Sequence, residues 1–440
     1  MADYHSTGIA RNISYKVLFD VYYNDAYSNL SIKKHFNALK KDEDKALATN
    51  IIFGTIKKDI FLSEVVKKLS SVDYDKIKPE IQVILKAGIY QLYFMDRVPA
   101  YAVVNDCVNL AKLFVSNKTG SFVNAVLRNA IRRKKEFENI KNDSDIPLWL
   151  TIYLSRFYDD VFLQTMEEDF LKSPDMFVRV NKLKSAPQDV YEELNREEKI
   201  CEATFMPDVF KALKPSAVLN NELMKNCTIS VQDISAALCA YALGAQEGDS
   251  IIDLCASPGG KSLHIASLTG NKAEITACDI YKHKIEFMKN IFKCFGADIE
   301  VIKNDAEEYC EEFYEKFDKV LLDAPCSGLG VIRRKPEILL RLSQQDIQNL
   351  IKMQESMLKN AAKYVKKGGV LLYSTCSINP EENELQIRKF LNDNNEFSLE
   401  DIVFPEKFYD NIDISSKGEI KLYSHEFFGD GFYICKLVKS

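Results

Sequence analysis

Apolar residues recur every three or four positions through the first third of the chain, which is the spacing of one face of an α-helix. Pro79 stands just before one of these repeats, where a proline suits the first turn of a helix. Because no strand-like alternation interrupts the pattern, we predict that residues 1–140 form a compact bundle of helices. The helical repeats cover residues 13–21, 81–92, 104–111 and 122–129.

A polar stretch, residues 141–147 (KNDSDIP), follows the bundle and is typical of a linker. Beyond it, residues 148–230 mix helical periodicity with one short strand-like run at 177–181. We expect residues 146–230 to form a small α+β connecting domain.

From about residue 231 the pattern changes to apolar runs that alternate with helical periodicity. Runs this apolar suit strands that are buried on both faces, and their alternation with helices indicates a parallel, doubly wound sheet. The expected fold is therefore multidomain, with an all-α bundle, the α+β connecting domain and a Rossmann-like α/β domain over residues 231–440. The strand-like runs cover residues 250–254, 275–279, 299–305, 319–323, 369–375 and 432–438.

Polar residues stand where these apolar runs end. The carboxyl ends of parallel strands share one edge of a sheet, and ligands bind at that edge. We therefore expect these side chains to surround one site. The residues are Asp253, Asp279, Asp305, Asp323 and Cys376.

Composition narrows the class of protein. The N-terminus lacks a basic and apolar leader, and no run of about 18 apolar residues is present to cross a bilayer. We therefore expect a cytoplasmic protein with no membrane partner. The 11 cysteines contain no C-x-x-C pair, which argues against a disulfide framework and a zinc site. The five histidines show no metal-binding spacing either, so no metal is expected.

The net charge of −6 does not by itself indicate a nucleic-acid partner. Residues 1–150 hold 23 Lys and Arg against 17 Asp and Glu, a net of +6, whereas the remainder holds 35 against 47, a net of −12. A basic front segment is able to bind a phosphate backbone locally, but a solvated surface explains the same charges equally well.

A glycine-containing loop, DLCASPGGK at residues 253–261, follows the first apolar run. Glycines let a ligand approach the backbone closely, and the helix expected next presents free N–H groups to an anion. Asp279 is placed to accept hydrogen bonds from ribose hydroxyls, and Asp305 to contact an adenine edge. The implied ligand is a nucleoside with an anionic head group, and S-adenosylmethionine fits that description.

Two cysteines follow two further runs, Cys326 in DAPC and Cys376 in STC. Cytosine C5 is a poor nucleophile, but a thiolate that adds to C6 makes C5 able to attack a methyl sulfonium. A base must then remove the C5 proton before the thiolate can leave. Cysteines in Ser-, Thr- and Pro-rich turns suit this chemistry, although the chemistry does not say which one is the nucleophile.

The stretches DLCASPGGKS, DAPCSGLG with IRRKPEI, and STCSINPEENE resemble the RNA (cytosine-5) methyltransferases of the NOL1/NOP2/sun family. The likeness covers about residues 177–440. Three front segments, ARNISYKVLFDVYYNDAYSN, RVPAYAVVNDCVNLAK and SFVNAVLRNAIRR, are similar to the NusB-type RNA-binding helical domain. The chain departs from the family pattern at Ser257, where alanine is usual, and at Lys335, where histidine is common.

The resemblance implies a class I methyltransferase that uses S-adenosylmethionine to modify one cytosine of 16S rRNA, position 967 in standard numbering. It implies Cys376 as the nucleophile and Cys326 as the residue that assists release of the covalent adduct. The partner is then 16S rRNA, free or in an early small-subunit particle, and the enzyme is expected to be a monomer. The implied cofactor site comprises Cys255, Ala256, Ser257, Pro258, Gly259, Gly260, Lys261, Asp279, Asp305 and Asp323.

Two other functions remain open from the sequence. A tRNA cytosine-C5 methyltransferase would use the same chemistry, and only the NusB-like front argues against it. A non-catalytic RNA-binding or antitermination factor would share that front, but it would not need Cys326, Cys376 or the glycine loop.

Overall fold

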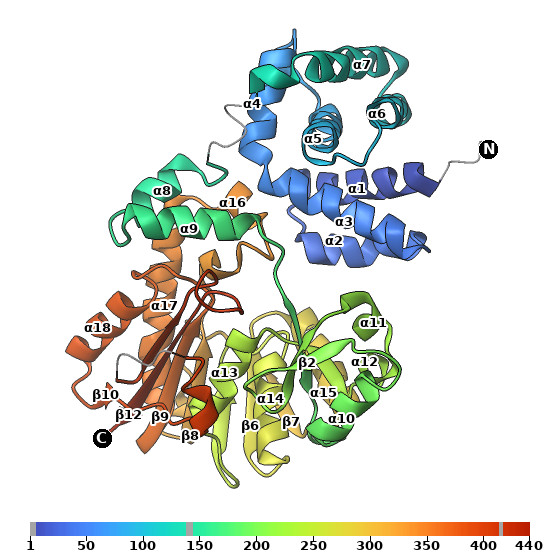
Figure 1. The fold of residues 1–440 in the computed structure, drawn as a ribbon. Helices are drawn as coiled ribbons and strands as arrows, with labels where there is room; N and C mark the ends of the chain where they lie inside the picture. The colour runs from blue at the N-terminus through green and yellow to red at the C-terminus, as the bar shows by residue number, and fades with distance from the viewer. Residues whose placement is uncertain (1–5, 138–143, 413–416) are drawn as a thin grey trace. The chain divides into compact units, whose positions relative to one another are not determined.

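The computed structural model describes residues 6–137, 144–412 and 417–440. Residues 141–143 of the predicted linker lie outside this part of the chain. The chain forms two compact units (Figure 1). The first comprises Met1–Lys172 with Arg334–Arg341, and the second comprises Ser173–Arg333 with Leu342–Ser440.

The first unit is helical, as predicted. The helices within residues 6–132 share a core that includes Val17, Ile52, Val66, Ile84 and Leu127. Its helices are α1 (Ser6–Tyr23), α2 (Ser28–His35), α3 (Asp42–Lys57), α4 (Asp59–Leu69), α5 (Pro79–Phe94), α6 (Ala100–Phe114), α7 (Asn117–Arg132), α8 (Leu148–Leu154), α9 (Asp160–Leu171) and α16 (Ile338–Arg341).

The segment Arg334–Arg341 belongs to this helical unit although it is distant in sequence. The Glu337 carboxylate is fully buried and accepts hydrogen bonds from the Ser28 backbone N–H at 2.9 Å and from the Ser28 hydroxyl at 3.0 Å. The Arg341 guanidinium donates to the carbonyls of Val21 and Ala26. These contacts fasten the segment to the end of α1 and the start of α2.

The second unit begins with a four-stranded antiparallel sheet in the order β2-β3-β1-β4. The three-part division of the chain at residues 140, 146 and 230 stays a prediction, because one compact unit is able to hold more than one domain. The elements here are β1 (Met176–Val180), α10 (Pro187–Leu194), β2 (Cys201–Ala203), β3 (Val209–Ala212), α11 (Pro215–Asn220), α12 (Glu222–Lys225) and β4 (Ile229–Val231).

The main sheet of this unit has the strand order β10-β12-β9-β8-β5-β6-β7, with β11 paired to β12. Strands β5 to β9 are parallel, which confirms the Rossmann-like fold. Strand β12 pairs antiparallel with β9, and β10 and β11 pair antiparallel with β12, so β12 runs against the parallel strands. The bounds are β5 (Ser250–Asp253), β6 (Glu274–Asp279), β7 (Ile299–Lys303), β8 (Phe317–Asp323), β9 (Val365–Thr375), β10 (Phe397–Leu399), β11 (Glu419–Leu422) and β12 (Phe432–Lys439).

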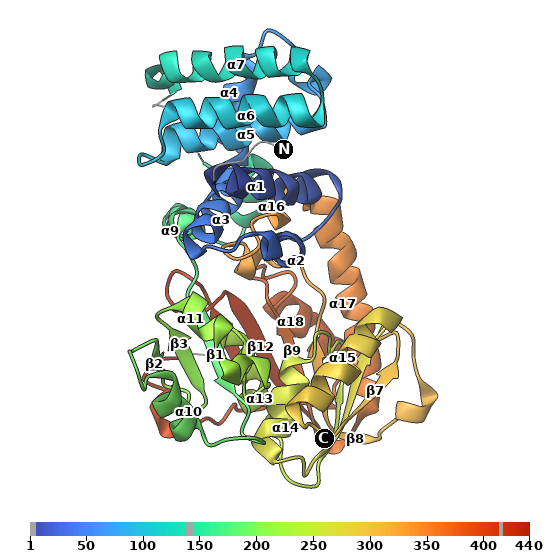
Figure 2. The same cartoon turned by 90° about the vertical axis from the view of Figure 1, so that its right-hand side faces the viewer.

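Helices cover both faces of this sheet (Figure 2). Ile251 and Leu321 face α13 (Ile234–Leu243) and α14 (Gly260–Thr269), and α15 (Lys282–Phe295) continues that layer. Ile252 and Leu322 point the other way, into a core shared with α17 (Gln344–Tyr364) and α18 (Glu384–Asp393). The runs are apolar throughout because both faces of each strand are buried.

A buried polar group joins the small sheet to the helix layer. His264 on α14 and Asp208 before β3 are both fully buried, with His264 Nε2 at 3.0 Å from the Asp208 carboxylate. The Tyr241 hydroxyl on α13 donates to the same carboxylate at 2.8 Å. Burial lowers the pKa of His264 to about 4, against an ordinary value of 6.5.

This lowered pKa predicts a stability that depends on pH. As pH falls below 6.5 the unfolded chain protonates His264 before the folded chain does, so folding stability is lost down to pH 4. The loss from this group alone is about 3 kcal/mol. Urea denaturation of the wild type and of His264→Gln measures it. Their difference in unfolding free energy should shift with pH in that window, and a constant difference would contradict the assignment.

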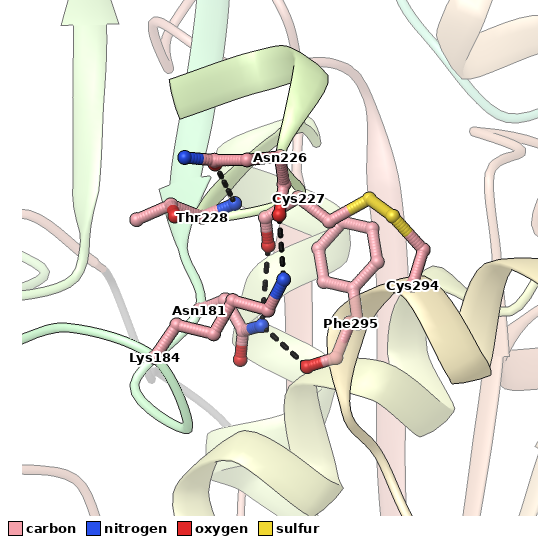
Figure 3. Close-up of a disulfide and its surroundings, with 7 residues drawn as sticks. All are labelled: Asn181, Lys184, Asn226, Cys227, Thr228, Cys294 and Phe295. Atoms are coloured by element: carbon pink, nitrogen blue, oxygen red, sulfur yellow. Dashed lines mark hydrogen bonds between the residues drawn. A yellow bond between two sulfur atoms is a disulfide. The ribbon is translucent and has the colours of Figure 1, made fainter. Parts of the chain in front are cut away.

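A disulfide between Cys227 and Cys294 lies beside this junction (Figure 3). It connects the loop before β4 to the last turn of α15, across a sequence separation of 67 residues. The Asn181 amide donates to the carbonyls of Cys227 and Phe295 next to it. The sequence, read for short cysteine spacings, did not predict this pair.

Candidate active site

The two cysteines of the sequence motifs lie side by side. Strands β8 and β9 are parallel neighbours, with Asp323 opposite Ser374, so the turns that follow them start at the same edge of the sheet. The Cys326 and Cys376 sulfurs are 3.3 Å apart. The hydrogen bond with Cys376, together with burial, raises the pKa of Cys326 well above its ordinary value. Two thiolates this close would repel each other, so the pair does not carry two negative charges together.

A cavity of about 450 Å³ opens at this edge and contains both cysteines. Its size suits a nucleoside-sized ligand. Of the predicted site residues, Cys255, Ser257, Asp279, Asp305, Asp323, Cys326 and Cys376 line it. Ala256, Pro258, Gly259, Gly260 and Lys261 are not among its lining residues.

The acids of the cavity wall are held in place by short-range contacts. Asp279 accepts a hydrogen bond from the Tyr281 backbone N–H at 2.9 Å, and Lys284 reaches it at 3.3 Å. Asp305 accepts from the Glu307 backbone N–H at 3.0 Å. Asp305 lies two residues beyond the end of β7, so it belongs to the loop rather than to the strand end that the sequence predicted.

Asp323 lies at the end of β8, between the cysteines and the glycine loop. It accepts a hydrogen bond from Lys261 at 2.7 Å and from the Ser374 hydroxyl at 2.8 Å. Burial disfavours the charge of Lys261, but the neighbouring carboxylate outweighs it and raises the pKa of Lys261. Lys261 thus remains a cation and forms an ion pair with Asp323, which lines the cavity, although Lys261 itself does not line it.

Asp253, which the sequence also predicted at the site, lies in the interior between β5 and α14. It is almost completely buried and accepts a hydrogen bond from the Ser262 hydroxyl at 2.6 Å. Burial raises its pKa to about 7. It ties the first turn of α14 to β5 and is not among the residues that line the cavity.

The glycine loop turns sharply from β5 into α14. Gly259 has a φ of +102°, a conformation that side chains disfavour. A Cβ atom there would lie 2.5 Å from the Phe292 ring. The first N–H groups of α14, which begins at Gly260, have no partner within the helix and are able to bind an anion.

Replacing Gly259 with alanine should therefore destabilise the protein. The strained φ and the contact with Phe292 together should cost about 2–4 kcal/mol. Thermal denaturation measures the effect. Gly260→Ala is the matched control, because the nearest atom to a Cβ there is 3.7 Å away, and equal melting temperatures for the two variants would contradict this account.

Several cavity residues were not singled out from the sequence. Met353 and Met357 come from α17, where they look like ordinary core positions of an amphipathic helix. Tyr281 is 53% exposed and follows Asp279 by two residues. Its closeness in sequence to an acid at a strand end was the one signal that could have placed it in the cavity wall. Within the described ranges, no group of three His, Cys, Asp or Glu side chains is placed to hold a metal ion.

Comparison with known proteins identifies the family. The model described as 16S rRNA methyltransferase RsmB/F matches residues 240–438, and the NusB family model matches residues 9–132. The probable ribosomal RNA small subunit methyltransferase B of Bacillus subtilis (strain 168) is 32% identical over 98% of both chains. The chain belongs to the RsmB/F methyltransferase family. A Yersinia enterocolitica member is 33% identical over 90% of this chain and 91% of its own length.

Solved structures share the fold of this chain. The crystal structure of PH0851 matches 100% of both chains with a TM-score of 0.86 at 26% identity. NSun6 from Pyrococcus horikoshii, solved with SFG, matches 67% of this chain and 98% of its own with a TM-score of 0.58. At 22% identity the second likeness shows the fold alone.

Membership of the RsmB/F family confirms the resemblance that the motifs carried, including the NusB domain at the front. The chain is therefore a methyltransferase. Among the helices that the structure describes, none has the length and apolar character needed to cross a membrane.

Proposed function

We propose that this methyltransferase transfers a methyl group from S-adenosylmethionine to C5 of one cytosine in 16S rRNA, through a covalent bond between Cys376 and cytosine C6. The observation that carries the proposal is the pair of sulfurs 3.3 Å apart in the cavity that also contains Asp279 and Asp305. Transfer to an exocyclic amine would need no cysteine.

The residues present fit the methyl donor. Asp279 offers a carboxylate to ribose hydroxyls, and the free N–H groups of α14 are suited to the donor's carboxylate. The described cavity is large enough for a nucleoside, and the cysteines share its wall. When bound, S-adenosylmethionine supplies a methyl group on a positively charged sulfur.

Cys376 acts first in the proposed reaction. Its thiolate forms a bond to cytosine C6, and the electrons of the C5–C6 double bond move toward C5. C5 would then bond to the methyl carbon while the bond from that carbon to the donor's sulfur breaks, and the electron pair would stay on that sulfur and cancel its positive charge. The order of the two roles follows the resemblance to the family, because two thiols 3.3 Å apart compete for one negative charge and their geometry alone does not rank them.

Release needs the C5 proton to leave. When a base removes that proton, its bonding electrons restore the C5–C6 double bond and the Cys376–C6 bond breaks with the electron pair on sulfur. Cys326 stands 3.3 Å from the departing sulfur. We assign it to this step, in which the Cys326 thiol gives its proton to the departing Cys376 sulfur and so stabilises the electron pair left there.

The RNA partner is inferred from the family. The relatives carry names of ribosomal RNA small subunit methyltransferase B, and the front of the chain matches the NusB family. We propose that the enzyme acts as a cytoplasmic monomer on 16S rRNA, free or in an early particle.

Methylation mapping tests the proposal. Purified protein with labelled S-adenosylmethionine should label 16S rRNA, and bisulfite sequencing should find 5-methylcytosine at one position. Labelling of tRNA in place of 16S rRNA would overturn the substrate, and label on an exocyclic nitrogen would overturn the chemistry.

A further inference from the structure

A buried carboxylate joins the two cysteine turns. Glu382 is fully buried at the start of the segment that leads into α18, six residues after Cys376. It lies behind the site and is not among the residues that line the cavity. Burying a carboxylate is costly unless several hydrogen bonds compensate, so its partners indicate why it is there.

The partners of Glu382 come from both turns. Its Oε2 accepts hydrogen bonds from the Ser327 hydroxyl at 2.5 Å and from the Ser377 hydroxyl at 2.7 Å. Its Oε1 accepts from the Ser327 backbone N–H at 2.8 Å. Ser327 directly follows Cys326, and Ser377 directly follows Cys376.

Two amides complete the shell around this carboxylate. Gln354 of α17 donates to Oε1 at 3.0 Å and also to the Pro325 carbonyl at 2.9 Å. Asn379 donates to Oε2 at 3.2 Å. In all five hydrogen bonds the partner donates and Glu382 accepts. An ionised carboxylate, whose two oxygens only accept, satisfies this pattern.

We propose that Glu382 is a positioning residue that sets the separation of the Cys326 and Cys376 sulfurs by holding the neighbouring serines on one carboxylate. Ser327 directly follows Cys326, and Ser377 directly follows Cys376. If either serine loses its hydrogen bond to Glu382 and its turn shifts, the sulfur of the adjacent cysteine moves with it. This inference rests on the proposed function for its catalytic meaning, but the geometry that it describes is measurable without any methylation.

Glu382→Gln is the most direct variant. The glutamine side chain has nearly the same shape, but an NH2 group replaces one carboxylate oxygen. This NH2 group is a donor that faces other donors, so hydrogen bonds to one of the two turns are lost and the turns move apart. We expect kcat to fall by about 100-fold, while KM for RNA and the dissociation constant of S-adenosylmethionine stay within about threefold. Glu381→Gln, at the neighbouring and partly exposed position, is the matched control and should retain wild-type kcat.

Phenylarsine oxide gives a readout that does not depend on catalysis, because its arsenic bridges two thiols that are already close. The wild type should bind it through Cys326 and Cys376, and Glu382→Gln should bind it about tenfold more weakly, since the pair is no longer preorganised. Cys376→Ser defines the background from the other cysteines. Unchanged arsenical binding with wild-type kcat in Glu382→Gln would overturn the inference.

Two serine variants keep the test decisive if Glu382→Gln does not fold. Ser327→Ala and Ser377→Ala each remove one hydroxyl from the carboxylate and should each lower kcat by about tenfold with KM unchanged. Wild-type kcat in both would overturn the inference. A wild-type enzyme that binds the arsenical but methylates no cytosine would refute the proposed function and leave the positioning role standing.

Discussion

Replacing Cys376 with alanine is expected to abolish methylation, with a loss of at least about 10⁴-fold in turnover. Without the sulfur no bond forms to cytosine C6, and C5 remains too weak a nucleophile to accept the methyl group. RNA containing 5-fluorocytosine gives the sharper measurement, because fluorine at C5 cannot leave as a proton does. The wild type should form a denaturation-resistant complex with this RNA, and Cys376→Ala should form none.

Cys310→Ala is a suitable control for this experiment. Cys310 is also a free and partly exposed cysteine, but it does not line the described cavity. Its alanine variant should retain both turnover and the trapped complex. If Cys376→Ala still formed the complex, the nucleophile would be another residue, and Cys326 would be the first to examine.

Replacing Cys326 with alanine should give the opposite behaviour. Cys376 is still able to bond to C6, but the release step slows, so the covalent complex with unmodified RNA should accumulate during turnover. We expect steady-state turnover to fall by about 10²–10³-fold while the first methyl transfer proceeds. Gel electrophoresis under denaturing conditions, with the methyl label followed into the protein–RNA band, measures both quantities.

The double variant Cys326→Ala with Cys376→Ala distinguishes the two roles. It should form no complex, because the bond to RNA depends on Cys376. A Cys326→Ala enzyme that turned over at the wild-type rate, with no accumulated complex, would show that Cys326 has no part in release.

The strands and the site edge were predictable because their signals are local. Both faces of β5 to β9 are buried, so their apolar runs are continuous, and the polar residues that end them mark the edge where ligands bind. The positions of Asp279, Asp323 and Cys376 directly after apolar runs therefore predicted that they lie at this edge of the sheet. The sequence pattern alone did not show which cysteine is the nucleophile, because the two thiols stand in similar turns. The resemblance to the family supplied that assignment.

The rest of the site depends on contacts between distant segments. Glu382 looks like one of several acids in a polar stretch, and only the approach of β8 to β9 places Ser327 and Ser377 on it. Cys227 and Cys294 are separated by 67 residues, so no spacing rule pairs them. Met353 and Met357 follow ordinary helical periodicity, and the sequence does not show that one face of α17 meets a cavity.

The place of Arg334–Arg341 in the helical unit has a consequence for how this protein can be divided. This short segment lies within the sequence of the catalytic half, yet Glu337 depends on Ser28 for its buried hydrogen bonds. A truncation that removes the front of the chain would therefore leave a carboxylate without donors, eleven residues after Cys326. The helical unit is therefore completed by a stretch that the sequence of the methyltransferase domain encloses, so a cut between the two domains in sequence does not separate the two units in space.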